Sequence, residues 1–175
     1  VFASGFVGTA FAQIAYEDYG KEFTQEEIDA MKQKAVLITT NSGTMIIEMY
    51  PEYAPGTVHN FLELVESGYY DGIVFHRIIP GFMIQGGDPN TKDTQVDRQA
   101  WGRGGPGYSI QAEFNTMQHD RGIVSMARGH IPDSAGSQFF IMHKDSPRLD
   151  GQYTAFGRLV PGTHSFSGLE AIASL

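Results

Sequence analysis

Residues 75–88 read FHRIIPGFMIQGGD, two short β-prone runs on either side of Pro80-Gly81. A Pro-Gly pair is a strong turn signal, because proline fixes φ and glycine accepts a positive φ. The stretch therefore predicts a strand, a sharp turn and a second strand. Side-chain alternation places Arg77 on the same face as Ile73 and Phe75. A cation on an apolar face costs free energy unless a ligand or partner uses it, so Arg77 is a candidate functional residue.

The second strand of this hairpin has a face with both apolar and polar side chains, and the glycines that follow it predict open space beside that face. Met83 and Gln85 share that face, and Phe82 lies next to them at the turn. Gly86 and Gly87 leave room for another backbone to approach closely. An arginine, bulky apolar side chains and one amide around open space indicate a docking site for an extended peptide. The alternative is a hairpin with an ordinary surface arginine.

Length and composition narrow the function classes. The 175 residues suit one domain with a full-sized core, and 41% hydrophobic and 18% charged residues are ordinary for a globular protein. The net charge of −8 argues against a nucleic-acid partner, which needs a basic face. The absence of cysteine excludes disulfides, thiol catalysis and cysteine-ligated zinc.

Residues 1–33 predict an N-terminal extension ahead of the main domain. Val1–Ala15 is apolar and rich in small residues, and Ala10-Phe11-Ala12 fits the small-x-small pattern of a signal-peptide cleavage site. We therefore expect export or membrane attachment through the N-terminus, and a strand-like arm on a cytoplasmic protein is the alternative. A linker over 16–23 leads to a short helix, which begins with a capping box formed by Thr24 and Glu27. We expect this helix to lie outside the main core.

The rest of the chain, residues 34–175, predicts one mainly β domain. About seven strands and two substantial helices follow from alternation and helical spacing, and strands occur before and after each helix. Runs of this kind close into a barrel or sandwich more readily than into a parallel sheet. The polar, glycine-rich stretch 88–107 predicts a loop that contains Trp101, with Arg98 and Arg103 as solvated charges. Strands are predicted at 35–40, 44–50, 122–127, 138–142 and 153–160 besides the central hairpin, and helices at 56–67 and 168–175.

A second informative stretch is Ser137–Ile141, which reads SQFFI. Alternation predicts Phe139 and Ile141 in the core, with Gln138 and Phe140 lining a site. Residues 125–128 can offer a backbone edge to an extended ligand. Residues 149–153 predict a turn with Leu149 on one flank and a phenol on the other.

These stretches together resemble the cyclophilins, a family of peptidyl-prolyl cis-trans isomerases. The resemblance runs from about Ala35 to Ser174 and implies a closed eight-stranded antiparallel barrel capped by two α-helices, with a site in a groove on its outside. The family continues into a final strand beyond the position of Leu175, so we expect the last strand to be absent from this chain. The matching motifs are FHRIIPGFMIQGGD at 75–88, GGPGY at 104–108, EF at 113–114, GIVSMA at 122–127, GSQFFI at 136–141 and LDG at 149–151.

The resemblance also implies the role of each site residue. Arg77 would be the catalytic arginine, and Gln85 would hold it and the substrate in place. The implied pocket for the substrate proline consists of Phe82, Met83, Phe140 and Leu149. Ala127 and Arg128 would line the peptide path, Gln138 would contact the peptide beside the proline, and Tyr153 would close the pocket. The implied activity is rotation about X-Pro bonds in proline-containing polypeptides, which assists protein folding and needs no cofactor and no metal. We expect a monomer.

The chain departs from the family pattern at two positions beside the pocket. Arg148 stands where the drug-sensitive members carry a tryptophan, and Tyr153 stands where many carry a histidine. The missing indole removes a contact for the macrocyclic drug, so we expect weak cyclosporin binding with isomerase activity retained. Arg128 replaces a smaller residue of many relatives, which can alter the preference for the residue before proline.

Two other classes of function stay open at this point. One is a binding module that keeps the groove but serves as an adaptor, and an intact Arg77 argues for catalysis over it. The other is a small ligand-binding barrel, which requires an interior cavity in place of a packed core. The six histidines show no metal-ligand spacing and no convincing catalytic triad. We interpret His76 as a histidine whose hydrogen bonds are satisfied within the fold.

Overall fold

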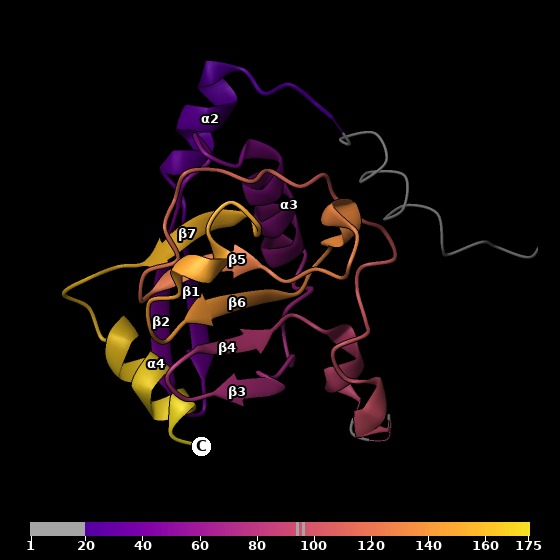
Figure 1. Ribbon diagram of the computed structural model, residues 1–175, viewed down its shortest axis with the longest axis vertical. Helices are drawn as coiled ribbons and strands as arrows, with labels where there is room; N and C mark the ends of the chain where they lie inside the picture. The colour runs from indigo at the N-terminus through magenta and orange to yellow at the C-terminus, as the bar shows by residue number, and fades with distance from the viewer. Residues whose placement is uncertain (1–19, 94, 96) are drawn as a thin grey trace, which may run out of the picture.

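The computed structural model describes residues 20–93, 95 and 97–175, and one curled antiparallel sheet organises them (Figure 1). The apolar N-terminal segment, with its predicted cleavage site, lies outside the described residues. None of the helices in the described part of the chain combines the length and apolarity needed to span a membrane. The helices are α2 (Gln25–Lys32), α3 (Pro55–Glu66) and α4 (Ser165–Ala173), and the strands are β1 (Ala35–Thr40), β2 (Gly43–Met49), β3 (Arg77–Ile79), β4 (Met83–Gly86), β5 (Ile123–Met126), β6 (Phe139–Met142) and β7 (Ala155–Leu159).

The sheet has seven strands in the order β1-β2-β7-β5-β6-β4-β3, and every neighbouring pair is antiparallel. The predicted mainly β class, the number of strands and the antiparallel arrangement are confirmed. Within the described residues β1 and β3 form the two edges of the sheet, so the curl is a half-barrel whose predicted closure is not seen. The long helices α3 and α4 lie on different sides of this curl (Figure 1).

The inside of the curl is filled by side chains. Phe61 of α3 contacts Phe139 and Phe156 with ring centroids 5.3 and 5.0 Å apart, and all three side chains are buried. Helix α4 adds Leu169 and Ile172 to the same cluster. A barrel built to hold a small ligand would need a cavity here, so the packed interior argues against that alternative.

Helix α2 begins at the predicted capping box, because Thr24 Oγ1 accepts from the backbone N–H of Glu27 and Glu27 Oε2 accepts from that of Thr24. The prediction that this helix lies outside the main core is wrong. Met31 is only 6% exposed and belongs to the main hydrophobic cluster, and Ile28 packs against it. A one-sided spacing of apolar residues over two turns was sufficient to bury one face of the helix.

The start of helix α3 is capped by a residue far away in sequence. Its N-cap residue, Ala54, has no side-chain oxygen to offer. Glu113 takes this role, because Oε1 accepts from Gly56 N at 2.9 Å and Oε2 accepts from Thr57 N at 2.7 Å and from the Thr57 hydroxyl at 2.6 Å. A carboxylate at this position also interacts favourably with the positive end of the helix dipole.

The predicted central hairpin is confirmed, with Gly81 at φ +75° in the turn between β3 and β4. Gly87 lies at φ +90°, and a Cβ there would be 2.3 Å from the carbonyl oxygen of Ser137, so another backbone does approach closely. One detail of the prediction is wrong. Strand β3 begins only at Arg77, whose side chain is exposed, so it shares no strand face with Ile73 and Phe75.

Candidate active site

A groove on the outside of the sheet has an apolar floor. Met83 and Phe140, from neighbouring strands β4 and β6, are 1% and 5% exposed, so the floor packs like a core. Phe82 from the hairpin turn and Leu149 from the 3-10 helix Pro147–Leu149 pack against it, as does Tyr153. These side chains form a second hydrophobic cluster, separate from the core. The groove above them has a volume of about 620 Å³.

Arg77 lines one wall of this groove and is held by Gln85. The two residues are direct partners in the β3–β4 ladder, and Arg77 Nη1 donates to Gln85 Oε1 at 3.3 Å. Arg77 is exposed to solvent, and the hydrogen bond to Gln85 restricts the direction of its guanidinium. The structure places this cation on the wall of a groove with an apolar floor, and its use in binding a ligand stays a prediction.

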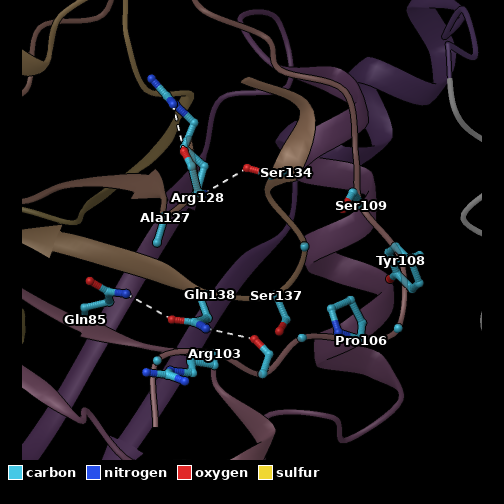
Figure 2. Close-up of a pocket in the computed structure, with 16 residues that line it drawn as sticks. Gln85, Arg103, Pro106, Tyr108, Ser109, Ala127, Arg128, Ser134, Ser137 and Gln138 are labelled. Carbon is cyan, nitrogen blue, oxygen red and sulfur yellow. Dashed lines mark hydrogen bonds between the residues drawn. The ribbon is translucent and has the colours of Figure 1, made fainter. Parts of the chain in front are cut away.

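Two amides continue the contact from Arg77 to a backbone carbonyl (Figure 2). Gln85 Nε2 donates to Gln138 Oε1 at 3.0 Å, and Gln138 Nε2 donates to the carbonyl oxygen of Gly104 at 2.8 Å. A carbonyl can only accept, so Gly104 requires the NH₂ end of Gln138 to face it. That orientation presents an oxygen to Gln85, which in turn presents its own oxygen to Arg77. We call these three contacts the amide relay.

Ala127 and Arg128 form the wall opposite the hairpin. Arg128 Nε donates to the carbonyl of Gln152 at 3.0 Å, and its guanidinium lies 4.8 Å from the ring centroid of Tyr153. The prediction that residues 125–128 offer a free backbone edge is wrong for Ser125 and Met126 and for the N–H of Ala127. Strand β5 pairs on both sides through Ser125, and Met126 pairs with Phe139 and bonds to Thr154. Ala127 donates its N–H to the carbonyl of Gln138, so it too is occupied.

A loop that sequence reasoning did not connect with the site closes one end of the groove. Buried Asp88 joins the two ends of this loop, because its Oδ1 accepts from Asn90 N and its Oδ2 from Gly102 N and Gly104 N. The loop thereby places Arg98 and Trp101 on the groove wall. Arg98 was predicted to be a solvated charge, and Trp101 was placed in the loop without a role. The signal available in the sequence was the glycine pattern at 102–107, which allows a close return of the chain.

The predicted site residues therefore come together. All of them line the groove except Gln138, which lines an adjoining pocket of about 570 Å³ that also includes Gln85, Ala127 and Arg128. Figure 2 shows this pocket with Arg103 and Arg128 on either side of the Gln85–Gln138 pair. An apolar slot, a restrained guanidinium and an amide-lined extension can hold an extended peptide with one apolar ring.

Comparison with known proteins decides the family. The model of the cyclophilin type peptidyl-prolyl cis-trans isomerase/CLD family matches residues 35–175. The chain belongs to the cyclophilin family. It is 48% identical over 117 residues to peptidyl-prolyl cis-trans isomerase B of Bacillus subtilis, covering 66% of this chain and 75% of the relative. It is 40% identical over 156 residues to peptidyl-prolyl cis-trans isomerase-like 2 of Cryptococcus neoformans, covering 87% of this chain but only 26% of that longer protein.

The fold of this chain is similar to that of a cyclophilin of known structure. The cyclophilin type peptidyl-prolyl cis-trans isomerase of Cryptosporidium parvum has 38% sequence identity and a TM-score of 0.67, over 78% of this chain and 85% of that one. That crystal structure was determined in the presence of the dipeptide Ala-Pro. The resemblance drawn from the sequence motifs is thereby confirmed at the level of the family.

Beneath the floor of this cyclophilin groove lies a buried histidine. His119 Nδ1 is 3.0 Å from Asp150 Oδ1 and its Nε2 is 3.0 Å from the hydroxyl of Ser125, which are the contacts of a catalytic triad. Ser125 is 0% exposed and the imidazole stacks on Phe140, so no substrate reaches the hydroxyl. Burial lowers the pKa of His119. The neutral ring supports Phe140 from below. The sequence analysis found no convincing triad among the histidines and missed that these three residues meet.

His76, beside Arg77, corrects one interpretation. Neither of its ring nitrogens has a hydrogen-bond partner in the described part of the chain, so it is not the satisfied histidine that we expected. Burial lowers its pKa, which keeps the imidazole neutral next to a guanidinium. The same described residues contain no group of three or more His, Cys, Asp or Glu arranged to hold a metal ion.

Proposed function

We propose that the groove binds a proline-containing segment and accelerates rotation about its X-Pro bond, with Arg77 as the catalytic residue. The observation that carries the proposal is the guanidinium of Arg77, held by Gln85 on the wall of an apolar slot. Phe82, Met83 and Phe140 of that slot supply surfaces on which a pyrrolidine ring packs, with Leu149 and Tyr153 closing it. The Ala-Pro dipeptide present with the Cryptosporidium relative has the chemistry that this slot suits.

Catalysis requires only that the groove bind the twisted peptide bond more tightly than the planar one. Turning a peptide bond through 90° removes amide resonance, with a barrier of about 18–20 kcal/mol. In the twisted state the proline nitrogen regains a lone pair, to which a guanidinium N–H donates more strongly than to the planar amide. Only an interaction stronger in the transition state accelerates the step. The slot holds the ring while the preceding carbonyl rotates, and no bond is made or broken.

The other groove residues receive roles from their positions. Gln85 keeps the guanidinium directed over the slot through the bond to Nη1. Gln138, Ala127 and Arg128 line the adjoining pocket, where the chain before the proline extends. Assistance to protein folding follows, because unaided X-Pro isomerisation takes tens to hundreds of seconds.

The decisive experiment is an isomerisation assay on an Ala-Pro peptide. Arg77→Ala should lower kcat/KM by about 100-fold or more, the usual effect of removing one transition-state donor. Arg158→Ala, on the exposed face of β7, is the matched control and should leave the rate unchanged. Equal rates for Arg77→Ala and wild type would mean that the groove is a binding module, which is the competing function.

We also propose that residues 34–175 form the isomerase domain with 1–33 as its extension, and that an eighth strand closes the curled sheet along β1. A pocket of about 210 Å³, lined by β1 and residues 70–75, supports this, because β1 is an edge strand of the described sheet. Leu37 of β1 is 62% exposed there. Slow hydrogen exchange of those β1 amides that point away from β2 would support closure, and rapid exchange of the same amides would contradict it.

Two proposals concern binding partners. Arg148, in place of an indole, has its guanidinium 4.7 Å from the ring centroid of Phe82, so we propose weak binding of cyclosporin. Calorimetric titration tests this, and affinity equal to that of a tryptophan-bearing cyclophilin would refute it. We propose a monomer because the net charge of −8 opposes self-association, and light scattering measures the mass.

The proposed location is outside the cytoplasm, by export or by a membrane anchor. The support is the apolar, small-residue-rich sequence of Val1–Ala15 and its small-x-small site. Fractionation of cells that express the full-length protein, with sequencing of its mature N-terminus, tests the proposal. Recovery in the cytosol with an intact N-terminal segment would favour the cytoplasmic alternative.

A further inference from the structure

The arginines of this acidic protein gather at the groove. The net charge is −8, yet five of the seven arginines surround the slot and its adjoining pocket. Arg77, Arg98 and Arg128 line the groove, Arg103 lines the adjoining pocket, and Arg148 lies over Phe82 at the rim. No aspartate or glutamate lines either space among the described residues.

None of these five guanidiniums forms an ion pair with a carboxylate in the part of the chain that the structure describes. Arg121, outside the groove, shows the usual alternative, because it contacts Glu170 at 2.5 Å. Three groove arginines lie against aromatic rings, which restrains them without neutralising their charge. The distances from guanidinium carbon to ring centroid are 5.2 Å for Arg98 on Trp101, 4.8 Å for Arg128 on Tyr153 and 4.7 Å for Arg148 on Phe82.

Because of this arrangement, the electrostatic potential of the groove differs in sign from that of the remaining surface. The remaining surface carries the acidic excess and repels an anionic ligand, whereas the concave, apolar-floored groove concentrates positive potential. Asp97, next to Arg98, is the nearest acidic neighbour in sequence, and its Oδ1 accepts from the backbone N–H of Gln99. Catalysis as proposed requires the positive charge of Arg77 alone, so the other four arginines call for a separate explanation.

We propose that the groove selects proline segments flanked by acidic residues, with Arg148 and Arg98 as specificity-determining residues. The inference rests on the proposed isomerase function and names its substrate class. Arg148 and Arg98, which lie beside the proline slot, bind the acidic residue of one flank, and Arg103 with Arg128 adds positive charge where the other flank extends into the adjoining pocket. The ligand chemistry is a carboxylate side chain within one or two residues of the proline.

The test uses three peptides that differ only in the residues flanking an Ala-Pro unit: glutamate, glutamine or lysine. Isomerisation is followed by NMR exchange, which avoids the sequence preference of a coupling protease. Each exposed ion pair contributes about 1.5- to 5-fold, so we expect kcat/KM for the glutamate peptide to exceed that for the lysine peptide by about 10-fold. The ratio should shrink between about 0.01 M and 0.15 M ionic strength, as the Debye length falls from roughly 30 Å to 8 Å.

Variants of single arginines show which side chains cause the preference for acidic flanks. Arg148→Gln and Arg98→Gln should each lower the ratio of glutamate to lysine peptide by about 2- to 5-fold, and Arg148→Lys should retain most of it. Arg158→Gln removes one exposed arginine outside the groove and should leave the ratio unchanged. Equal kcat/KM for all three peptides in the wild type, or an equal loss in Arg158→Gln, overturns the inference. A glutamine peptide that is not isomerised at all overturns the proposed function instead.

Discussion

Replacing Gln138 with leucine should lower the activity that depends on Arg77. In the amide relay, the orientation of the Gln138 amide determines which end of the Gln85 amide faces the guanidinium. In the wild type the carbonyl of Gly104 forces the NH₂ end of Gln138 toward itself, so oxygen faces Gln85 and then Arg77. Leucine has a similar volume but neither donates nor accepts. Gln85 then has no acceptor for its own NH₂ group and can turn that group toward the guanidinium.

The magnitude follows from the bonds that are lost. Gln138 makes two neutral hydrogen bonds, of 3.0 and 2.8 Å, each worth about 0.5–1.5 kcal/mol of stability. We therefore expect Gln138→Leu to lower the free energy of unfolding by about 1–3 kcal/mol. The loss of one orienting bond to Arg77 should lower kcat/KM by about 5- to 30-fold, which corresponds to roughly 1–2 kcal/mol. That loss is smaller than for Arg77→Ala, since the guanidinium is still present.

A double-mutant cycle separates positioning from direct contact with the peptide. If the relay acts as a unit, Gln138→Leu has little further effect in a Gln85→Leu background. If Gln138 only contacts substrate, the two losses multiply. Gln118→Leu, at an exposed glutamine, is the control for a general effect of the substitution. Multiplying losses, or a change of less than about 2-fold in the single variant, would refute the relay.

Three further predictions concern stability and drug binding. Glu113→Ala should lower the free energy of unfolding by about 2–4 kcal/mol, because it leaves the first turn of α3 and the Thr57 hydroxyl without their acceptor; urea titration measures this. Burial lowers the pKa of His119 below its ordinary 6.5, so the unfolded chain binds protons first and stability should fall as the pH drops below about 6.5. His76 acts in the same direction, so His119→Gln should reduce this slope in urea midpoints between pH 7.5 and 5.5 without abolishing it. Arg148→Trp should tighten cyclosporin binding by about 10-fold or more in calorimetry, through an added aromatic contact; unchanged affinity would show that the arginine is not the obstacle.

The hairpin, the strand count and the site walls followed from local patterns. Pro80-Gly81 specifies a turn through the φ of two residues, and alternation on β4 and β6 places Met83 and Phe140 on one side of the sheet. Such signals need only near neighbours. The family resemblance then supplied the fold and the activity, which alternation by itself left open between a barrel and a sandwich.

Long-range features were missed because no local pattern carries them. The return of residues 89–104 over the groove depends on buried Asp88, whose carboxylate binds backbone amides more than ten residues away. From the sequence Arg98 therefore looked like a solvated charge. The capping of α3 by Glu113 joins segments more than fifty residues apart. Tertiary packing also determines that the His76 ring has no hydrogen-bond partner among the described residues. The burial of Met31 was missed for the same reason, because most members of the main hydrophobic cluster are distant from it in sequence.

The apolar floor of the groove and its charged side chains come from two different kinds of structure. Its apolar floor comes from strands β4 and β6, whose opposite faces carry Ile84 and Ile141 in the main core, so the floor is as rigid as the core itself. Its charges, apart from Arg77, come from loops and two short 3-10 helices, which pack less tightly and tolerate substitution. Selectivity for flanking charge can therefore change without altering the slot that holds the proline. This separation is why a variant of Arg148 should shift the ratio between peptides, whereas a variant of Arg77 should lower the rate for every peptide.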